Sequence, residues 1–477
     1  MPRKQDFLIG KQWRSGDRYF TVTNPASGEP VAEVALAGPG DIEEAIVLAE
    51  RGFTTTRKLP AYMRSRICAQ IARGIEARAE EFARTIALES GKPMIFARAE
   101  VARSVSTFNI AAEEALRLQG EVLTLDITSA ARGKAGITCR FPIGPVAGIS
   151  PFNFPLNLVA HKVAPAMAAG NPIVLKPSST TPLTALLLGE VVAATEAPEG
   201  GLSVLPTSRE DAAPLTEDPR FKMITFTGSA EIGWDIKRRA GKKKVVLELG
   251  GNAGVIVEPD ADLAFAAKRT VFGAFAYSGQ VCISVQRAFV HESVFSRFVD
   301  MLKHEAETLV IGDPLDDAVN FGPMIDGKNA QRIESWIANA RTGGARVVTG
   351  GKRNGNIVPP TILTGVAPGA ELACNEAFGP VLAVEPYADF DEAVRRMNDS
   401  DFGLQAGVFT QRMDLSLRAF NELEVGGVVL NDVPTFRVDN MPYGGVKDSG
   451  FGREGIRYSL EEMTEIKLLV FNHERER

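Results

Sequence analysis

Residues 146–205 read VAGISPFNFPLNLVAHKVAPAMAAGNPIVLKPSSTTPLTALLLGEVVAATEAPEGGLSVL. Short apolar runs alternate in this stretch with longer apolar segments, which begin after Pro155 and at Leu183. Short runs are typical of buried strands and longer segments of helices. The short runs are Val146–Ile149, Ile173–Leu175, Leu202–Leu205 and, further on, Met223–Phe226. This order predicts an α/β fold in which helices cover a parallel sheet.

The residues before this stretch divide into a helical part and an extended part. Over residues 40–118, apolar residues recur every three or four positions, which predicts several helices. Over residues 122–141, apolar and polar residues alternate around a turn expected at Gly133–Gly136. That pattern predicts a protruding β-hairpin.

The residues after it predict a second α/β series. Strands are expected at Val245–Leu249, Gly254–Val257 and Ala288–Val290, with helices at Ala261–Ala276 and Val294–Glu307. Near the C-terminus, Ile466, Leu468 and Val470 alternate with other residues, and little chain follows on which they could pack. A strand in that position is expected to pair with the edge of a partner's sheet, so the sequence predicts an oligomer.

Composition excludes several classes of function. Of 477 residues, 45% are hydrophobic and the formal net charge is −6, so nucleic acid and anionic membranes are not expected partners. The most apolar stretch, Leu183–Thr195, is shorter than a membrane helix, and residues 1–14 lack an apolar leader, so the expected location is the cytoplasm. Four dispersed cysteines without C-x-x-C and four histidines without H-E-x-x-H predict no metal site.

Cys282 is the best candidate for a nucleophile. It follows an expected helix, and the small residues Ser278 and Gly279 would let a substrate approach the thiol closely. A buried, inert cysteine is the alternative, because free cysteines commonly behave as small apolar residues. That buried role is expected for the other three cysteines, Cys68, Cys139 and Cys374.

Two further polar residues occupy positions that suit catalysis. Glu248 ends an apolar strand, where burial would raise the pKa of its carboxyl group toward that of a general base. A structural ion pair is the alternative for this residue. Asn153 lies between two prolines, in a fixed backbone that would present its amide to a developing oxyanion, and a simple turn is the alternative.

Two strand-to-helix connections suit an anion. Gly228 and Ser229 follow an apolar strand and open a helix, whose backbone amides would bind a pyrophosphate. An N-cap serine after a tight turn explains the same residues. Lys176 follows another strand at its carboxyl end, where its ammonium group would hold ribose hydroxyls or phosphate, and a surface lysine is the alternative.

Seven segments occur in the order and spacing of one known family. They are PFNFP at 151–155, KPS at 176–178, FTGS at 226–229, ELGG at 248–251, GQVC at 279–282, EAFGP at 376–380 and PYGGVKDSGFGREG at 442–455. With them the chain resembles the NAD(P)-dependent aldehyde dehydrogenase superfamily over nearly its whole length. The resemblance is to its lactaldehyde and non-phosphorylating glyceraldehyde-3-phosphate dehydrogenase-like branch.

The resemblance implies two Rossmann-like parallel-sheet domains and a β-hairpin oligomerisation arm. Residues 1–120 and 142–247 would form the dinucleotide-binding domain, and residues 248–440 the catalytic domain. Residues 121–141 and 456–477 would form the arm. The resemblance also implies a homo-oligomer, either a dimer or a tetramer.

It further implies a reaction on a small-molecule aldehyde. Cys282 would attack the aldehyde to give a thiohemiacetal, whose oxyanion Asn153 and the Cys282 backbone N–H would hold. Hydride would leave for the nicotinamide of NAD or NADP, and Glu248 would activate water to hydrolyse the resulting thioester. The residues that would bind the cofactor are Lys176, Ser179, Gly228, Ser229, Glu376, Phe378 and Phe152.

Departures from the family pattern bear on cofactor and substrate. Many NAD-preferring relatives have an acid where this chain has Ser179, so a 2′-phosphate is not repelled and NADP use is expected alongside NAD. The segment around Arg437 resembles that of members acting on small hydroxylated or anionic aldehydes. Arg437 would bind the substrate together with His161 and Arg103, and a surface or ion-paired arginine is the alternative.

Two other functions stay open from the sequence. A CoA-acylating enzyme would pass the acyl group to CoA, but such relatives often lack the general base that Glu248 supplies here. A non-catalytic binding protein of the same fold would have lost site residues. Cys282, Glu248, Asn153, Lys176 and Glu376 are all present.

Overall fold

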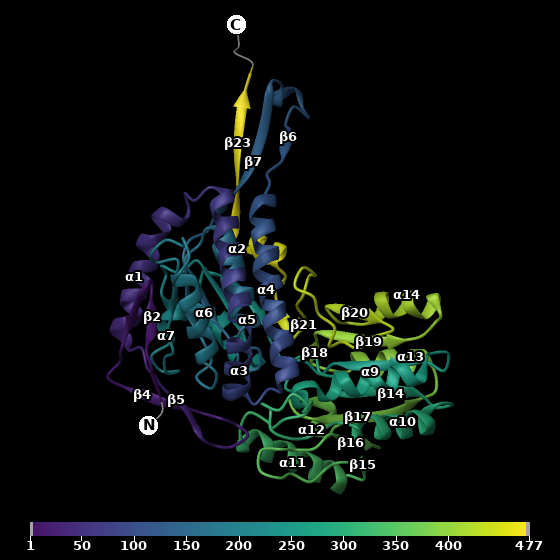
Figure 1. Cartoon of the computed structure of the whole chain (residues 1–477). Coiled ribbons are helices and arrows are strands. Elements are labelled where there is room, and N and C mark those ends of the chain that lie inside the picture. The colour runs from purple at the N-terminus through teal and green to yellow at the C-terminus, as the bar shows by residue number, and fades with distance from the viewer. Residues whose placement is uncertain (1–2, 474–477) are drawn as a thin grey trace.

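The stretch that follows residue 145 forms the centre of an eight-stranded sheet, as its alternating apolar runs predict. In the computed structural model, which describes residues 3–473, the strand order is β22-β12-β11-β8-β9-β10-β2-β3 (Figure 1). The run from β12 to β10 is parallel, and the edge strands pair antiparallel with their neighbours. These strands are β2 (Phe7–Ile9), β3 (Gln12–Arg14), β8 (Val146–Ile149), β9 (Ile173–Lys176), β10 (Leu202–Val204), β11 (Met223–Thr227), β12 (Lys244–Glu248) and β22 (Gly450–Phe451).

The strand predicted at Val245–Leu249 does not open the second series, and that prediction is wrong. β12 pairs in parallel with β11, from Met223 opposite Lys244 to Thr227 opposite Glu248. Helix α8 (Ala230–Arg239) supplies the crossover between them, so β12 extends the first sheet. Glu248 therefore lies at the carboxyl edge of the first sheet, just before the chain enters the second.

The second body is built on a seven-stranded sheet of order β15-β16-β17-β14-β13-β19-β20, parallel except for β15. Its strands are β13 (Gly254–Val257), β14 (Arg287–His291), β15 (Arg346–Thr349), β16 (Thr361–Thr364), β17 (Val381–Tyr387), β19 (Gln405–Phe409) and β20 (Gly427–Leu430). Its helices are α9 (Leu263–Phe275), α10 (Phe295–Glu307), α11 (Gly327–Thr342), α12 (Glu371–Cys374), α13 (Phe390–Asn398) and α14 (Met413–Glu422). Two parallel-sheet bodies are thus confirmed.

Two further small sheets lie near the start of the chain and near residue 446. The first has the order β1-β5-β4 and the second pairs β18 with β21. Their strands are β1 (Arg3–Gln5), β4 (Tyr19–Thr23), β5 (Pro30–Ala35), β18 (Phe402–Gly403) and β21 (Val446–Lys447).

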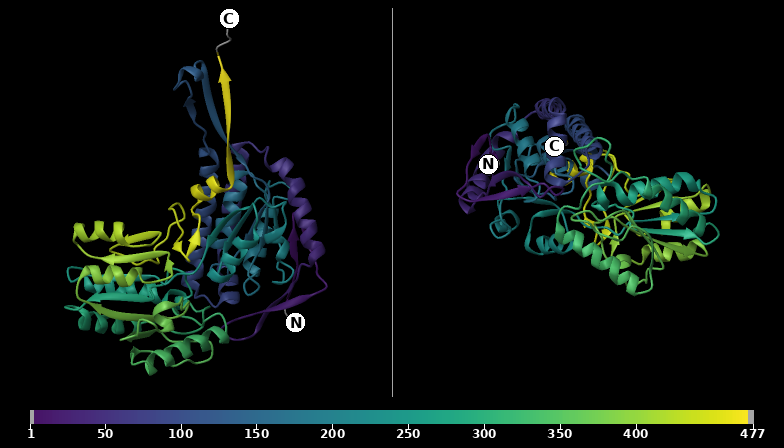
Figure 2. Two further views of the ribbon diagram at one scale, coloured as in Figure 1. Left: turned by 180° about the vertical axis from the view of Figure 1, so that it is seen from behind. Right: turned by 60° about the horizontal axis from the view of Figure 1, so that its bottom comes forward.

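The predicted hairpin projects from the first body as an arm (Figure 2). β7 (Lys134–Pro142) pairs antiparallel with β6 (Val122–Thr124) on one side and with β23 (Thr464–Asn472) on the other. The turn lies before residue 134 and contains a short 3₁₀ helix, Ser129–Ala131, so its predicted place at Gly133–Gly136 is wrong. Gly136 is instead part of β7, opposite Val470.

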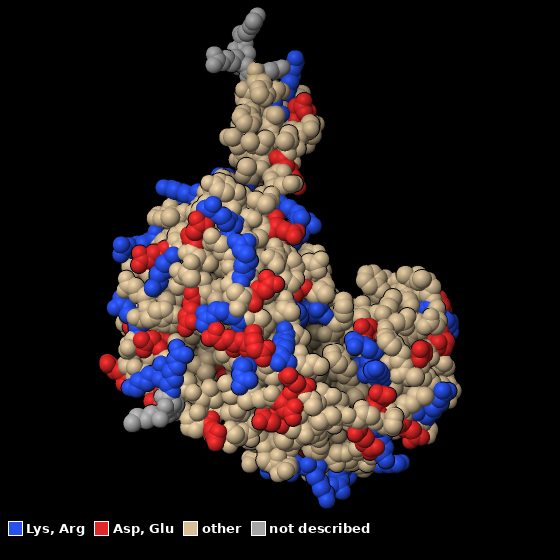
Figure 3. Space-filling view, viewed as in Figure 1, with Lys and Arg blue, Asp and Glu red and all other residues tan. Residues whose placement is uncertain are grey.

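The C-terminal part of the arm is shorter than residues 456–477. Helix α15 (Ile456–Glu462) packs on the first body, where Ile456, Leu460 and Met463 join the hydrophobic core. Only β23 projects, and residues 474–477 lie outside the described chain. On the face in view, uncharged atoms cover most of the arm (Figure 3). One edge of β23 remains without a strand partner within the described residues.

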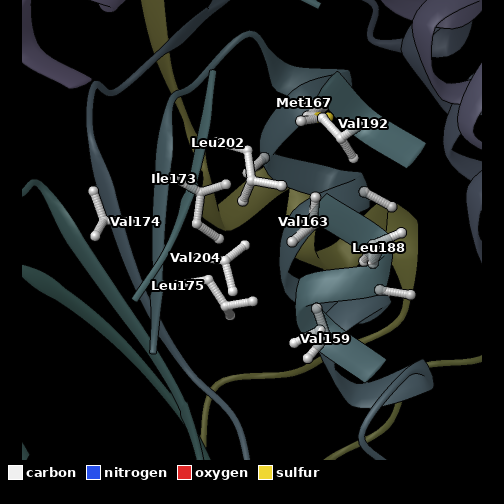
Figure 4. Close-up of a cluster of buried hydrophobic side chains, with 14 of the residues drawn as sticks. Val159, Val163, Met167, Ile173, Val174, Leu175, Leu188, Val192, Leu202 and Val204 are labelled. Atoms are coloured by element: carbon white, nitrogen blue, oxygen red, sulfur yellow. The ribbon is translucent and has the colours of Figure 1, made fainter. Parts of the chain in front are cut away.

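Helix α5 (Asn157–Ala169) is the centre of the first body, and all of its residues are buried. It packs between the sheet and helices α2 and α4, which explains why most of its residues are apolar and why its Asn157, His161 and Lys162 have buried polar partners. Figure 4 shows side chains of α5 facing those of α6, β9 and β10. The remaining helices of this body are α1 (Pro39–Thr56), α2 (Ala61–Ala77), α3 (Ala79–Ser90), α4 (Met94–Arg117), α6 (Leu183–Ala193) and α7 (Ala213–Glu217). This packing fixes the loop that precedes α5, residues 150–156.

Candidate active site

A cavity of about 390 Å³ opens at the carboxyl edge of the first sheet. Parallel strands end at the same edge, so the loops after β8, β9, β11 and β12 all reach this cavity. Residues of the second body close it from the other side. The predicted site residues on its wall are Phe152, Asn153, Lys176, Ser179, Gly228, Ser229, Cys282, Glu376 and Phe378.

The loop that carries Cys282 begins with an unusual turn. Tyr277 and Ser278 have φ angles of 48° and 54°, in the left-handed region that side chains rarely adopt. Both residues are buried, and each donates its hydroxyl hydrogen to a backbone carbonyl of another segment, at 2.9 and 2.7 Å. These contacts hold a backbone that would otherwise relax. The turn therefore fixes the position of the thiol.

The Cys282 thiol lines the cavity and is half-buried. Burial raises the pKa of this thiol to about 12. Its Sγ lies 3.1 Å from the Tyr443 hydroxyl oxygen, a contact that the sequence did not suggest. The thiol thus lies at a cavity wall, hydrogen-bonded and packed against a small apolar cluster of Ile283, Leu404 and Tyr443.

Asn153 ties the two loops of the site together. Its side chain is 3% exposed, and its Nδ2 donates to the carbonyl oxygen of Gln280 at 2.9 Å. Gln280 lies two residues before Cys282, so the amide is held close to the thiol. An amide nitrogen carries two hydrogens, and this bond uses one of them.

Glu248 is a buried carboxylate without a hydrogen bond. It is 3% exposed, and neither carboxylate oxygen has a hydrogen-bond partner within residues 3–473. Burial, and then the negative charge of Glu454, raise the pKa of its carboxyl group well above the ordinary value. No ion pair of Glu248 occurs in the described chain, so the structural ion pair is not the explanation of this residue. A carboxylate in this state is suited to accept a proton.

Lys176 and the Gly228–Ser229 turn line the side of the cavity nearest the first sheet. Burial lowers the pKa of the Lys176 ammonium group, and no acid is paired with it in the part of the chain that is described. Ser229 precedes α8, but its hydroxyl makes no capping bond, so the N-cap explanation lacks its hydrogen bond. A Cβ on Gly228 would lie 2.5 Å from the Phe226 ring, so glycine is required at this turn.

Glu376 and Phe378 reach the cavity from the second body. Glu376 Oε1 accepts the backbone N–H of Gly251 at 2.9 Å, and burial raises the pKa of its carboxyl group to about 7. Phe378 has a φ of 45°, and its ring meets that of Phe152 edge to face, with centroids 5.6 Å apart. The two rings form an apolar wall next to polar groups, which is a common composition for a cofactor site.

Two of the three predicted substrate residues meet at one carboxylate, Asp439. Arg103 Nη2 donates to Asp439 Oδ1 at 2.7 Å, and His161 Nε2 lies 2.9 Å from the same oxygen. Burial opposes ionisation of Asp439, but His161 and Arg103 outweigh it and lower the pKa of this carboxyl group. Arg103 Nε and His161 Nδ1 are buried and have no hydrogen-bond partner within residues 3–473.

The third predicted substrate residue, Arg437, belongs to a buried ion pair. Its Nη2 donates to Glu454 Oε2 at 3.1 Å, and the two side chains are 7% and 2% exposed. Lys162 pairs with the other oxygen of Glu454 at 3.2 Å. The guanidinium also lies over the Tyr443 ring, 3.6 Å from its centroid. The sequence assigned no role to Asp439, Glu454 or Tyr443, although the last two lie in the glycine-rich segment 442–455.

The other three cysteines lie outside the lining of this cavity. Cys68 is buried as expected, but Cys139 and Cys374 are exposed, because β7 projects into solvent and α12 is a single surface turn. No group of three His, Cys, Asp or Glu side chains suited to a metal ion occurs in residues 3–473. In the same residues, no helix is long and apolar enough to cross a membrane.

Two parallel-sheet bodies that close one cavity over a thiol, a lysine and the Glu376 carboxyl group form the arrangement expected of a dinucleotide-dependent oxidoreductase. The model of the aldehyde dehydrogenase family matches residues 13–469, and the chain belongs to that family. A 3-sulfolactaldehyde dehydrogenase of Priestia aryabhattai is 42% identical over 471 residues, which cover 98% of each chain.

Solved structures agree with this membership. Aldehyde dehydrogenase 21 of Physcomitrella patens, in complex with the reaction product succinate, is 45% identical with a TM-score of 0.97 over 99% of each chain. An NADP-dependent glyceraldehyde-3-phosphate dehydrogenase of Bacillus halodurans, complexed with NADP, is 36% identical with a TM-score of 0.96. It covers 99% of this chain and 100% of its own. The predicted family, fold, enzyme class and use of NAD or NADP are confirmed.

Proposed function

We propose that this enzyme oxidises a small hydroxylated or anionic aldehyde to its carboxylic acid through a thioester on Cys282. One observation carries the proposal: Cys282, Asn153 and the cofactor-side residues line a single cavity. Glu248 is not on the wall of that cavity, but a Cβ at Gly444 would lie 2.9 Å from its Oε1, and the preceding residue, Tyr443, contacts the Cys282 sulfur. The residues needed for attack, oxyanion binding and hydrolysis therefore lie together.

The first half of the reaction uses Cys282 and Asn153. The Cys282 thiolate forms a bond to the carbonyl carbon, and the carbonyl π electrons move to oxygen. The second Nδ2 hydrogen of Asn153 and the Cys282 backbone N–H would hold this oxyanion. Because Asn153 is already fixed by Gln280, its amide needs little reorganisation to do so.

The second half uses Glu248. An ionised Glu248 accepts a proton from a water molecule, whose oxygen attacks the thioester carbon. The carbon–sulfur bond then breaks, the acid leaves, and Cys282 is restored as a thiolate. Glu248 suits this step because neither of its oxygens is occupied by a hydrogen bond within residues 3–473.

NAD or NADP fits the cavity wall. Lys176 offers a buried cation without an ion-pair partner in the described chain, and glycine at 228 leaves room beside the helix N-terminus. Lys176 and Glu376 would hold ribose hydroxyls, Ser229 the pyrophosphate, and Phe378 with Phe152 the nicotinamide side. When bound, the nicotinamide supplies the hydride acceptor. Ser179, which lines the cavity without a charge, would leave space for the 2′-phosphate of NADP.

The substrate is proposed to carry a hydroxyl or an anionic group. Arg103, His161 and Arg437 each keep a buried ring or guanidinium nitrogen without a hydrogen-bond partner within residues 3–473. Arg437 also lies over Tyr443, whose hydroxyl contacts the Cys282 sulfur. Arg103 and Arg437 are cations, and the anionic group of a short aldehyde bound at Cys282 is proposed to lie near them. The names of the sulfolactaldehyde and succinate-bound relatives fit this class of substrate.

The test measures the oxidation of a panel of aldehydes through the absorbance of the reduced nicotinamide. Short anionic, hydroxylated and plain aliphatic aldehydes are each supplied with NAD and with NADP, in the presence and absence of CoA. We expect acid formation without CoA, higher kcat/KM for anionic or hydroxylated aldehydes, and NADP at least as effective as NAD. A requirement for CoA would replace hydrolysis by acyl transfer, and a preference for plain aldehydes with NAD alone would contradict the substrate and cofactor assignments.

Replacing Arg103 with Gln tests the anionic substrate. Loss of a hydrogen bond to a charged group costs about 1.5–3 kcal/mol, so kcat/KM for anionic aldehydes should fall by about 10- to 100-fold. Asp439 would keep its bonds to His161 and Asn157, so the fold should persist. Neutral aldehydes should be oxidised as before.

The matched control for Arg103 is Arg98→Gln. Arg98 lies on the same helix α4 with an exposed side chain, paired with Glu80. Surface ion pairs contribute little, so this change should leave both substrate classes unaffected. An equal loss for anionic and neutral aldehydes in Arg103→Gln would show that Arg103 acts on structure and does not select the substrate.

We also propose a homo-oligomer, a dimer or tetramer, formed through the arm. Apolar residues of β23 such as Ile466, Leu468 and Leu469 are about half exposed, and the free edge of this strand can pair with another chain.

The domain division proposed for this enzyme gives dinucleotide binding to residues 1–120 and 142–247 and the nucleophile to residues 248–440. A cytoplasmic location is proposed because the four described cysteines are free, and cytosolic conditions keep thiols reduced.

A further inference from the structure

Within residues 3–473, the Tyr443 hydroxyl is the side-chain group that lies within hydrogen-bonding distance of the Cys282 sulfur. The two atoms lie 3.1 Å apart, a short distance for a contact that involves sulfur. Tyr443 is 3% exposed, and its ring packs beside Cys282 and Leu404 in a small apolar cluster. Water therefore does not compete for this contact from the side of the tyrosine.

The backbone of Tyr443 is held rigidly. Its N–H donates to the Glu454 carbonyl oxygen at 3.0 Å, and the Glu454 N–H donates back to the Tyr443 carbonyl oxygen at 2.7 Å. The next residue, Gly444, has a φ of +151°, and a side chain there would lie 2.9 Å from Glu248 Oε1. The hydroxyl thus stays near the sulfur because the chain on both sides of the ring is fixed.

The Tyr443 ring is also held from its face. The Arg437 guanidinium lies 3.6 Å from the ring centroid, and Glu454 holds that guanidinium from the other side. A cation over an aromatic face is attracted by the electrons of the ring. Drawing electron density from a phenol strengthens its O–H as a donor. Burial keeps the pKa of the Tyr443 hydroxyl well above its ordinary value, so the donor hydrogen is retained at neutral pH.

We propose that Tyr443 is a catalytic residue, whose hydroxyl donates a hydrogen bond to the Cys282 sulfur and stabilises the thiolate that attacks the substrate. This role rests on the proposed function of Cys282. No proton passes from Tyr443 to sulfur. When the carbon–sulfur bond forms, the negative charge moves to the carbonyl oxygen, and the hydrogen bond to sulfur weakens.

Two opposing changes set the effect of this hydrogen bond on the reaction rate: a larger thiolate fraction and a lower nucleophilicity of the thiolate. A hydrogen bond to a charged group is worth about 1.5–3 kcal/mol, so it lowers a thiol pKa by about one to two units. The thiolate fraction at neutral pH then rises by about 10- to 100-fold. Its intrinsic nucleophilicity falls by roughly the square root of that factor, so the net gain in rate is about 3- to 10-fold.

The test compares Tyr443→Phe with wild-type enzyme in alkylation by iodoacetamide. The modified Cys282 peptide is followed by mass spectrometry, which separates it from the exposed Cys139 and Cys374. At pH 7, without cofactor or aldehyde, alkylation of Cys282 in Tyr443→Phe should be about 3- to 10-fold slower. The kcat/KM for aldehyde should fall in parallel, while the affinity for NADP stays unchanged.

The matched control is Tyr387→Phe. Tyr387 is another buried tyrosine, and its hydroxyl contacts Val257 and Glu258 in the second body, away from the thiol. Cys282 of that variant should be alkylated at the wild-type rate. This would show that loss of a buried tyrosine hydroxyl does not by itself change the reactivity of Cys282. Equal or faster alkylation of Tyr443→Phe would overturn the proposal, because the hydroxyl would then not stabilise the thiolate.

The same experiment separates this proposal from the proposed function. If wild-type enzyme oxidised aldehydes and Tyr443→Phe alkylated at the wild-type rate, the role of Tyr443 alone would fail. If Tyr443→Phe alkylated slowly but wild-type enzyme oxidised no aldehyde, the hydrogen bond to the thiolate would stand and the aldehyde reaction would be overturned.

Discussion

Replacing Cys282 with Ser is expected to abolish aldehyde oxidation. A serine hydroxyl ionises far less readily than a thiol, and no group of the described site would deprotonate it fully. Loss of the nucleophile in a covalent mechanism costs on the order of 10⁴- to 10⁶-fold in kcat. The measurement is the rate of nicotinamide reduction with the best aldehyde of the panel.

Binding of the cofactor should survive this change. The oxygen of serine is smaller than sulfur, and the cofactor-side residues Lys176, Ser229 and Glu376 are untouched. Cys374→Ser is the control, because that exposed cysteine donates only to the Pro368 carbonyl and a serine can do the same. Turnover retained in Cys282→Ser would show that another residue, or no residue, is the nucleophile.

Replacing Glu248 with Gln should separate the two halves of the reaction. An amide has nearly the shape of the carboxylate but cannot accept a proton from water. The thioester would still form, so one equivalent of reduced nicotinamide should appear in a fast burst. Steady-state turnover should then be about 100- to 10,000-fold slower than in wild type. Stopped-flow absorbance measures both phases.

The pH dependence gives a second signature of Glu248. Burial and the nearby Glu454 raise the pKa of its carboxyl group, so the protonated form persists to higher pH than for an exposed glutamate. Only the ionised form accepts a proton, and wild-type turnover should therefore fall as the pH is lowered through this pKa. The Glu248→Gln variant should lack that decline in its slow steady-state phase. A variant with wild-type steady-state turnover would contradict the role of Glu248 as the base.

The general architecture could be predicted from local patterns, whereas strand order could not. The alternation of apolar runs after residue 145 predicted parallel strands and crossover helices, since buried strands and helices differ in length and period. The strand β12 was assigned to the wrong sheet because an apolar run does not reveal which neighbour it pairs with. The position of the arm turn was misplaced for a related reason: Gly136 is compatible with both a turn and a strand facing a large residue.

The same limit applies to the site: local sequence patterns predict residues at strand and helix ends but do not reveal contacts between distant segments. Local patterns predicted Cys282, Lys176 and Ser229, which follow an expected strand or helix, and the family resemblance added Glu376 and Phe378. Tyr443 was missed because a tyrosine among glycines has no distinctive local pattern, and its contact with sulfur comes from a segment 161 residues away. An ion pair was one of the alternatives for Arg437, but its partner, Glu454, could not be named because a local pattern does not show which acid packs against an arginine.

The most direct test of the thioester mechanism is mass spectrometry of the Glu248→Gln variant after one turnover. The variant is mixed with NADP and the best aldehyde of the panel, quenched in acid at the end of the burst, and digested. We expect the matching acyl group on the Cys282 peptide, in an amount equal to the reduced nicotinamide, and none after the further change Cys282→Ser. Reduced nicotinamide formed while Cys282 stays unmodified, or an acyl group on a different residue, would contradict it.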